Sequence, residues 1–131
     1  MHKRFIKGKI IKTVSDPENG ITKVDVKWTI DFSRLPQMRF LLDFISYAFT
    51  NEDFISIDPT FDYIGNDHYD SFTFTTTASS KVSDKDTYNE DTGYHIALIR
   101  NRRKALHTYN KLINVINSKI DKVFQEAIRH N

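Results

Sequence analysis

The sequence predicts an α+β fold: an antiparallel sheet, one helix packed on it, and a long C-terminal helix that is a candidate for a coiled-coil dimer. Two patterns lead to this prediction. Apolar and polar residues alternate near the N-terminus, and apolar residues recur at helical spacing near the C-terminus. A chain of 131 residues, 39% of them hydrophobic, matches one ordinary domain with a modest core. We expect residues 1–131 to form a single domain, with a mainly β core over residues 1–83 and a helical extension over residues 89–130.

The first predicted element is a β-hairpin. Residues 4–13 favour one strand, and residues 24–32 (VDVKWTIDF) alternate with the two-residue period of a half-buried strand. The segment between them contains Asn19-Gly20, a pair that favours the positive φ of a tight hairpin turn. The alternation places Trp28 on the buried face, together with Val24, Val26 and Phe32.

A helix over residues 34–50 is predicted to follow the hairpin. Ser33 is a suitable N-cap, and Pro36 is tolerated in a first helical turn. Apolar residues then recur at helical spacing, so one face of the helix would pack on the sheet. These residues are Leu35, Met38, Leu42, Ile45 and Phe49.

At least two further strands are predicted in the middle of the chain. Residues 54–58 (FISID) and residues 70–79 (DSFTFTTTAS) are short runs rich in β-branched and aromatic residues. The segment between them, residues 58–70, carries Pro, Gly, Asn and Asp, which are typical of a loop.

The last predicted element is the longest. No proline interrupts the chain from about Asn89 to His130, which favours one long helix or two closely joined ones. Apolar residues repeat there at heptad a and d spacing, and this predicts self-association. A dimer is favoured and a trimer stays open; alternatively, the same stripe covers the protein's own sheet. The stripe is Leu106, Tyr109, Ile113, Ile116, Ile120, Val123 and Ala127.

Charge is divided along the chain although the net charge is only +2. Residues 1–42 hold nine Lys and Arg against four acids, residues 43–91 hold two against eleven, and residues 94–131 hold eight against two. These blocks either neutralise each other in the fold or face outward as separate poles. The near-neutral total argues against an extended duplex DNA binder.

The junction of acidic and basic blocks supplies the candidate ligand site. Arg100, Arg103 and Lys104 lie on or beside one helical face, where cationic groups suit the phosphates of a nucleotide. Tyr88 or Trp28 is available to stack on a base, with Asn89 as a further base-side contact. The predicted ligand-binding residues are therefore Trp28, Tyr88, Asn89, Arg100, Arg103 and Lys104. Pairing of the basic residues with the acidic middle segment is the alternative.

The same junction also has a structural explanation. Asn89 or Asp91 can cap the long helix, and Glu90 places negative charge at the positive end of its dipole. Gly93 lacks a Cβ and would let the helix start pass close to a neighbouring strand. The segment is at minimum a strand-to-helix corner.

The sequence predicts no catalytic residue, metal ligand or cofactor. It contains no cysteine, no Gly-x-Ser-x-Gly elbow and no Gly-rich phosphate loop. His68, between Asp67 and Asp70, is the best candidate for a general base, but an exposed loop histidine explains it more simply. His95 and His107 lie too far apart in sequence for a helical zinc pair.

Residues 82–105 (VSDKDTYNEDTGYHIALIRNRRKA) resemble a signature of small tailed-phage accessory proteins, in which Asp-x-Phe-(Asp/Asn) precedes Gly, Ile/Leu-Ala and Arg. The matching residues are Asp86, Tyr88, Asn89, Gly93, Ile96, Ala97 and Arg100; the departures are Val82 for Cys, Tyr88 for Phe and Asn101 for Ala. The resemblance covers 24 of 131 residues and implies a phage origin and a β-core-then-helix corner. The predicted outline is also similar to Thoeris anti-defence proteins, which sequester cyclic nucleotide signals.

Together these observations favour a non-enzymatic phage accessory protein that sequesters a host-defence component, with a cyclic nucleotide signal as the most concrete ligand. One alternative is a protein–protein inhibitor of the anti-CRISPR kind, in which the acidic segment 52–91 imitates nucleic acid. Another is a single-stranded nucleic-acid binder that uses the basic ends of the chain. The basic N-terminus is not followed by a long apolar run, so neither a signal peptide nor a membrane span is expected, and the host cytoplasm is the expected location.

Overall fold

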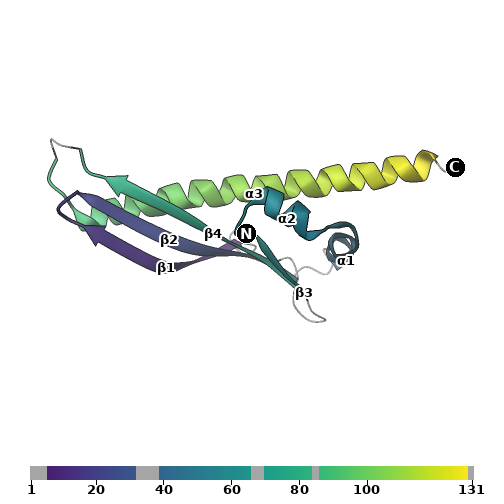
Figure 1. The fold of residues 1–131 in the computed structure, drawn as a ribbon, viewed down its shortest axis with the longest axis horizontal. Helices are drawn as coiled ribbons and strands as arrows, with labels where there is room; N and C mark the ends of the chain where they lie inside the picture. Colours follow the sequence, from purple (N-terminus) through teal and green to yellow (C-terminus); the bar gives the residue numbers. More distant parts are fainter. Residues whose placement is uncertain (1–5, 32–38, 66–69, 84–85, 130–131) are drawn as a thin grey trace.

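The computed structural model describes residues 6–31, 39–65, 70–83 and 86–129. Its fold is α+β, as predicted, with an antiparallel sheet and a long C-terminal helix. The elements are β1 (Ile6–Asp16), β2 (Ile21–Asp31), α1 (Arg39–Ala48), α2 (Asn51–Ile57), β3 (Asp62–Gly65), β4 (Asp70–Lys81) and α3 (Glu90–Arg129). The four strands lie in the order β1-β2-β4-β3, and α3 runs along one face of the sheet and extends beyond it (Figure 1).

The predicted hairpin is present as β1 and β2. A four-residue loop joins the strands, and the amide of Gly20 donates to the carbonyl of Pro17 at 3.3 Å. Gly20 alone adopts a positive φ, of 65°; Asn19 does not, so the turn is longer than the tight two-residue turn that an Asn-Gly pair favours. Gly20 therefore provides the left-handed residue that closes the loop.

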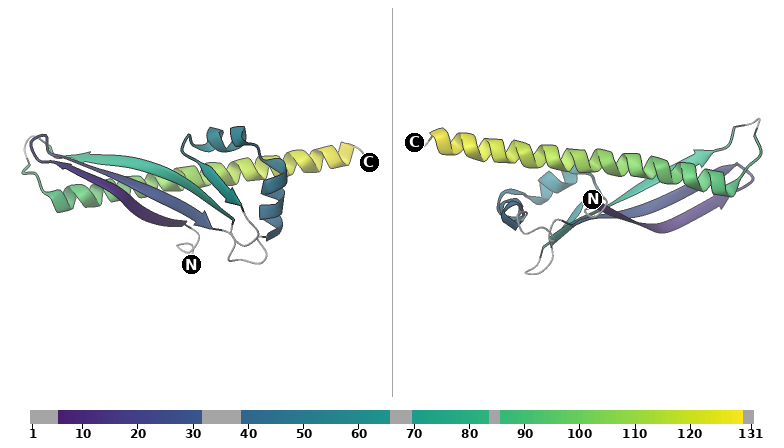
Figure 2. Two further views of the ribbon diagram at one scale, coloured as in Figure 1. Left: turned by 60° about the horizontal axis from the view of Figure 1, so that its bottom comes forward. Right: turned by 180° about the vertical axis from the view of Figure 1, so that it is seen from behind.

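The faces of β2 follow the predicted alternation. Val24 and Val26 are buried beneath α3, Lys23 and Lys27 are exposed, and Trp28 is half-buried on the α3 side. Phe32, which was predicted to share this face, lies outside the described residues. The sheet thus has one face packed on α3 and one face open to solvent, as the two ribbon views in Figure 2 show.

The middle of the chain departs from the prediction. Residues 54–58 do not form a strand, because most of them belong to the helix α2. Thr50 and Asp53 make a complete capping box that starts this helix, and the cap overrides the β preference of the isoleucines that follow. The segment predicted as a loop contains β3, which pairs with Asp70–Thr73 of β4.

The helix predicted over residues 34–50 is described from Arg39 onward as α1, while Ser33, Leu35, Pro36 and Met38 lie outside the described residues. Ile45 of this helix is fully buried. Phe54 of α2 contacts four aromatic rings from three parts of the chain, with centroids between 5.3 and 5.9 Å apart: Phe49, Phe61, Tyr63 and Phe72. This cluster fills the end of the core that α3 reaches last.

Helix α3 packs on the sheet through residues that grow in size along its length. A Cβ on Gly93 would lie only 2.6 Å from Thr22 Oγ1, so helix and strand are in closest approach at the helix start. The buried residues that follow are Ala97, Asn101, Ala105, Thr108, Leu112 and Ile116. Small residues allow the close approach at one end, and larger ones fill the wider space beside the aromatic cluster.

The apolar stripe predicted for self-association is divided between two environments. Ile116 is buried, and Tyr109 and Ile113 pack against the core, so this part covers the protein's own sheet. Leu106 and the stripe beyond Ile116 are exposed; Ile120 and Val123 keep 40% and 45% of their surface. No helix in the described part of the chain is both long and apolar enough to cross a membrane.

Candidate functional site

A buried chain of hydrogen bonds fixes the first half of α3 on the sheet. Trp28 Nε1 donates to Thr76 Oγ1 at 2.8 Å, and the Thr76 hydroxyl donates to Asn101 Oδ1 at 2.6 Å. The Asn101 amide group then donates to the carbonyls of Val24 and Ala97, each at 3.0 Å. Every polar group of Asn101 is satisfied, so this network sets the register of helix and sheet.

The network determines the role of Trp28. Its ring lies over Gly8 of β1, where a Cβ would come within 2.7 Å of the indole. Its one polar donor is used by Thr76. Trp28 is therefore placed as a packing residue beneath α3, and it does not line either of the two cavities described below.

Tyr88 and Asn89 form the corner before α3. The Asn89 side chain accepts the amide of Thr92 at 3.1 Å, so Asn89 is the N-cap. The hydroxyls of Tyr88 and Thr22 lie 3.0 Å apart, and Ser80 donates to the carbonyl of Gly93. Both predicted residues line an open cavity of about 510 Å³ at this end of the sheet. The corner function predicted for Asn89 and Gly93 is thus present.

The second half of β4 has a free edge. β3 pairs with β4 only as far as Thr73. Beyond Thr73, the outward-facing carbonyls of alternate β4 residues accept hydrogen bonds from side chains of other segments. Thr60 donates to the carbonyl of Thr75 and also accepts the Thr75 amide at 2.9 Å. We call the segment Thr75–Ser79 the free edge of β4.

Two of the predicted ligand residues cover the rest of this free edge. Lys104 Nζ donates to the carbonyl of Thr77, and Arg100 Nη1 donates to the carbonyl of Ser79 at 2.6 Å. Both side chains are exposed, and the carbonyls they contact carry no formal charge, so neither contact is an ion pair. The same contacts protect an unpaired strand from pairing with another chain.

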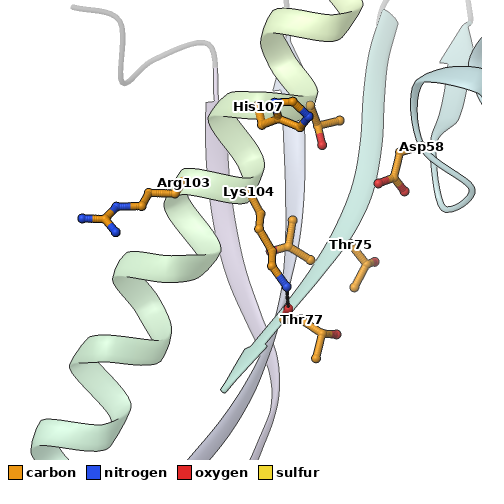
Figure 3. Close-up of a pocket in the computed structure, with 8 residues that line it drawn as sticks. Asp58, Thr75, Thr77, Arg103, Lys104 and His107 are labelled. Atoms are coloured by element: carbon orange, nitrogen blue, oxygen red, sulfur yellow. Dashed lines mark hydrogen bonds between the residues drawn. The ribbon is translucent and has the colours of Figure 1, made fainter. Parts of the chain in front are cut away.

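A groove of about 440 Å³ lies between the free edge of β4 and α3. Its lining combines cationic and hydroxyl side chains, and Asp58 is its one carboxylate: Asp58, Thr75, Thr76, Thr77, Arg103, Lys104, His107 and Thr108. Figure 3 shows Lys104 directed at Thr77 with His107 one turn further along α3, whereas the Arg103 guanidinium points away from β4. We call this feature the β4–α3 groove.

The six predicted ligand residues therefore lie in three places. Trp28 is beneath α3, Tyr88 and Asn89 are at the corner, and the three cations lie along α3 beside β4. Thr60 and Asn101, which organise this region, were not predicted from the sequence, and His107 was not assigned to it. The spacing of Arg100, Lys104 and His107 by four and three residues was the available signal, since it places all three on one helical face.

Among the described residues, no carboxylate of the acidic middle segment forms an ion pair with Arg100, Arg103 or Lys104. Several carboxylates of this segment are engaged by nearby hydroxyl, amide or ammonium groups: Asp53, Asp58, Asp86 and Glu90. They lie on α2 and around the start of α3, which are well separated along the molecule (Figure 1). Within the described ranges, the proposed pairing of basic helix residues with the acidic segment is seen at one position, Lys119 with Asp53 at 2.9 Å.

The Asp53–Lys119 pair ties α2 to α3. Partial burial alone would raise the pKa of Asp53, but hydrogen bonds from the Thr50 amide and the Lys119 ammonium outweigh it, and the pKa lies below its ordinary value. Lys119 also donates to the carbonyl of Ala48 and lies over the Phe49 ring. This contact is where α3 leaves the rest of the fold.

Within the described ranges, no group of three or more His, Asp or Glu side chains is placed to hold a metal ion. His68, the candidate general base, lies outside those ranges. Comparison of the chain with protein families, curated proteins and solved structures found no match.

Proposed function

We propose that the protein is a non-enzymatic binding protein of the phage accessory kind, which sequesters a phosphate-bearing host-defence signal, such as a cyclic nucleotide, in the host cytoplasm. The observation that supports this most is the β4–α3 groove. There Lys104 and His107 of α3 and residues Thr75–Thr77 of β4 line a space within the usual size range of small-molecule sites.

The donors of the groove suit a phosphate. Lys104 lines the groove and uses one of its N–H groups on the Thr77 carbonyl; Arg100 lies one helical turn before it, beside the groove, and uses one on the Ser79 carbonyl, so most donors of both cations stay free. The amides of Thr77 and Ser79 point from the same strand edge as their carbonyls. An anion in the groove would meet charged side chains and backbone N–H groups together, which is a strong form of phosphate recognition.

Titration calorimetry with adenine-containing cyclic nucleotides tests this proposal. Arg100→Ala and Lys104→Ala should each weaken binding by about tenfold or more, because each removes a charge-assisted hydrogen bond of roughly 1.5–3 kcal/mol. Arg102→Ala is the matched control: Arg102 is an exposed arginine on the same helix that neither lines the groove nor hydrogen-bonds to the free edge of β4. Its binding should be unchanged.

Thermal denaturation of the same variants separates a ligand site from an edge cover. If Arg100→Ala and Lys104→Ala lower the melting temperature and the wild-type protein binds no nucleotide, the two cations serve the strand edge alone and the proposal is wrong. Mass spectrometry of ligand released from the purified protein provides an independent check on the chemical class.

We also propose that the protein self-associates through the end of α3. Beyond Lys119 the helix carries an exposed apolar row, with Phe124 and Ile128 exposed by 64% and 55% beside Ile120 and Val123. Ile120 and Val123 continue the heptad spacing of Ile113 and Ile116, Phe124 and Ile128 lie beside them, and a second copy of the same helix offers a complementary row. The dimer is the favoured state.

Sedimentation at tens of micromolar measures this association. Ile120→Asp with Val123→Asp would place charge in the apolar contact and convert the oligomer to a folded monomer. Ser118→Asp with Gln125→Asp adds the same charge to exposed positions on the opposite side of the helix and should leave the oligomer intact. A monomeric wild-type protein would show that the exposed row has no such partner.

A further inference from the structure

The face of the sheet opposite α3 carries a cluster of lysines. Strand alternation and the register of β1 with β2 place five lysines on this face, and all five side chains are exposed. We call this cluster the lysine face; it consists of Lys7, Lys9, Lys12, Lys23 and Lys27.

Two of these lysines are directly opposed. Lys9 pairs with Lys27 across the two strands, where Cβ atoms lie about 4.5–5.5 Å apart. Like charges in this position destabilise a sheet. Among the described residues, no carboxylate lies within ion-pair distance of either lysine. Asp25, the acid nearest in the register, is opposite Lys12 and accepts a hydrogen bond from Thr77.

Protection of the sheet edge explains only part of the cluster. β1 is an edge strand, and its lysines together with the irregular register at Ile11 discourage pairing with another chain. Lys23 and Lys27 belong to β2, which lies between β1 and β4 and has no open edge. Edge protection therefore does not explain why Lys23 and Lys27 share a face with the β1 lysines.

The net charge of +2 does not reflect the local charge of this surface. Two of the acids that lower the net charge lie away from this face. Asp53, on α2, pairs with Lys119, and Glu90, at the start of α3, accepts a hydrogen bond from Ser15. Strand alternation also places Asp16, Asp25 and Asp31 on this face, so its five lysines leave it an excess of positive charge, of the kind that neutralises phosphates of a nucleic-acid backbone.

We propose that the lysine face binds the phosphate backbone of double-stranded nucleic acid without reading its bases. The face offers no aromatic side chain from β1, β2 or β4 within the described ranges, so it lacks the stacking platform typical of single-strand binders. Hydroxyls of Thr73 and Ser79 extend the same face along β4 and are suited to phosphate contacts. This site is separate from the β4–α3 groove.

Fluorescence anisotropy with short labelled duplexes of two unrelated sequences tests the proposal between about 50 and 200 mM salt. We expect equal affinity for both sequences and a logarithmic salt slope of about −4, since each neutralised phosphate contributes about −0.9. Lys9→Gln with Lys27→Gln should make the slope shallower by about 2 and weaken binding at low salt at least about tenfold.

Lys111→Gln with Lys122→Gln is the charge-matched control, because both lysines are exposed on α3. This control should retain most of the affinity. The proposal is overturned if the wild-type protein does not bind duplex at low salt, if both double variants weaken binding equally, or if the single strand binds more tightly than the duplex.

The Lys9→Gln, Lys27→Gln variant should fold at least as well as wild type, because it removes a repulsive pair from an exposed surface. If its melting temperature falls, the single variants Lys23→Gln and Lys27→Gln are measured, and each should make the logarithmic salt slope shallower by about 1. Arg100→Ala should leave duplex binding unchanged, so failure of the nucleotide site and failure of the lysine face give different results.

Discussion

The two halves of helix α3 have similar apolar spacing but different surroundings. From Ala97 to Ile116, every third or fourth residue is buried against the sheet. Beyond Lys119, the apolar residues stay largely exposed, with Phe124 at 64%. The segment from Lys119 to Arg129 is too short to be a stable helix by itself, so its helical structure depends on the packed half that precedes it. The comparison teaches that apolar spacing predicts a helical face but does not identify what covers that face.

The sharpest test of this difference removes the same side chain from both environments. Leu112 is fully buried in the core cluster, and Leu106 on the same helix is 57% exposed. Leu112→Ala should lower the free energy of unfolding by about 2–5 kcal/mol, because it leaves a cavity in the core. Leu106→Ala should change it by less than about 0.5 kcal/mol. Urea denaturation measures both, and equal losses would contradict the packing described for α3.

A smaller effect is expected from the polar network that fixes the packed half. Asn101→Ala should lower the free energy of unfolding by about 1–3 kcal/mol, since Thr76 and the Val24 carbonyl each lose a buried hydrogen-bond partner. Asn110→Ala, at an exposed position of the same helix, is the control and should change little. Loss of Trp28 tertiary fluorescence in Asn101→Ala would further show that the network positions the indole. A neutral effect would mean that packing alone sets the register.

Much of the packed half followed from the sequence because its signals are local. Alternation around Trp28, the absence of proline in α3 and the cap at Asn89 each depend on a few neighbouring residues. The close passage at Gly93 also followed, since a glycine in a helix start has few other uses. Such features can be recognised before the fold is known.

Other features depend on contacts distant in sequence. Asn101 contacts Thr76 and Val24, 25 and 77 residues away, and nothing near it in sequence indicates burial. The cover of the β4 edge by Thr60, Lys104 and Arg100 is equally non-local, which is why the two cations were predicted as ligand residues or as partners of the acidic segment, and not as a cover of the strand edge. The failure at α2 was different: the capping box of Thr50 and Asp53 was visible in the sequence, and the β preference of its isoleucines obscured it.

The smallest expected effect lies at the boundary between the two halves, where Asp53 binds Lys119. Asp53→Asn keeps an oxygen for the Thr50 amide but removes the charge, and at neutral pH it should cost less than about 1 kcal/mol because the pair is partly exposed to solvent. The pKa of Asp53 is lowered in the folded protein from 3.8, so its contribution is present above about pH 4 and is lost as pH falls through the folded value.

Urea denaturation of wild type and Asp53→Asn at a series of pH values should therefore give a stability difference that is constant above about pH 5 and shrinks below about pH 4. In a Lys119→Met background the same substitution should cost less at neutral pH, because the charge partner is already missing. A difference that persists at the lowest pH would assign the loss to the cap of α2 and not to its ion pair with α3. The boundary between the packed and exposed halves would then rest on packing around Ile116 alone.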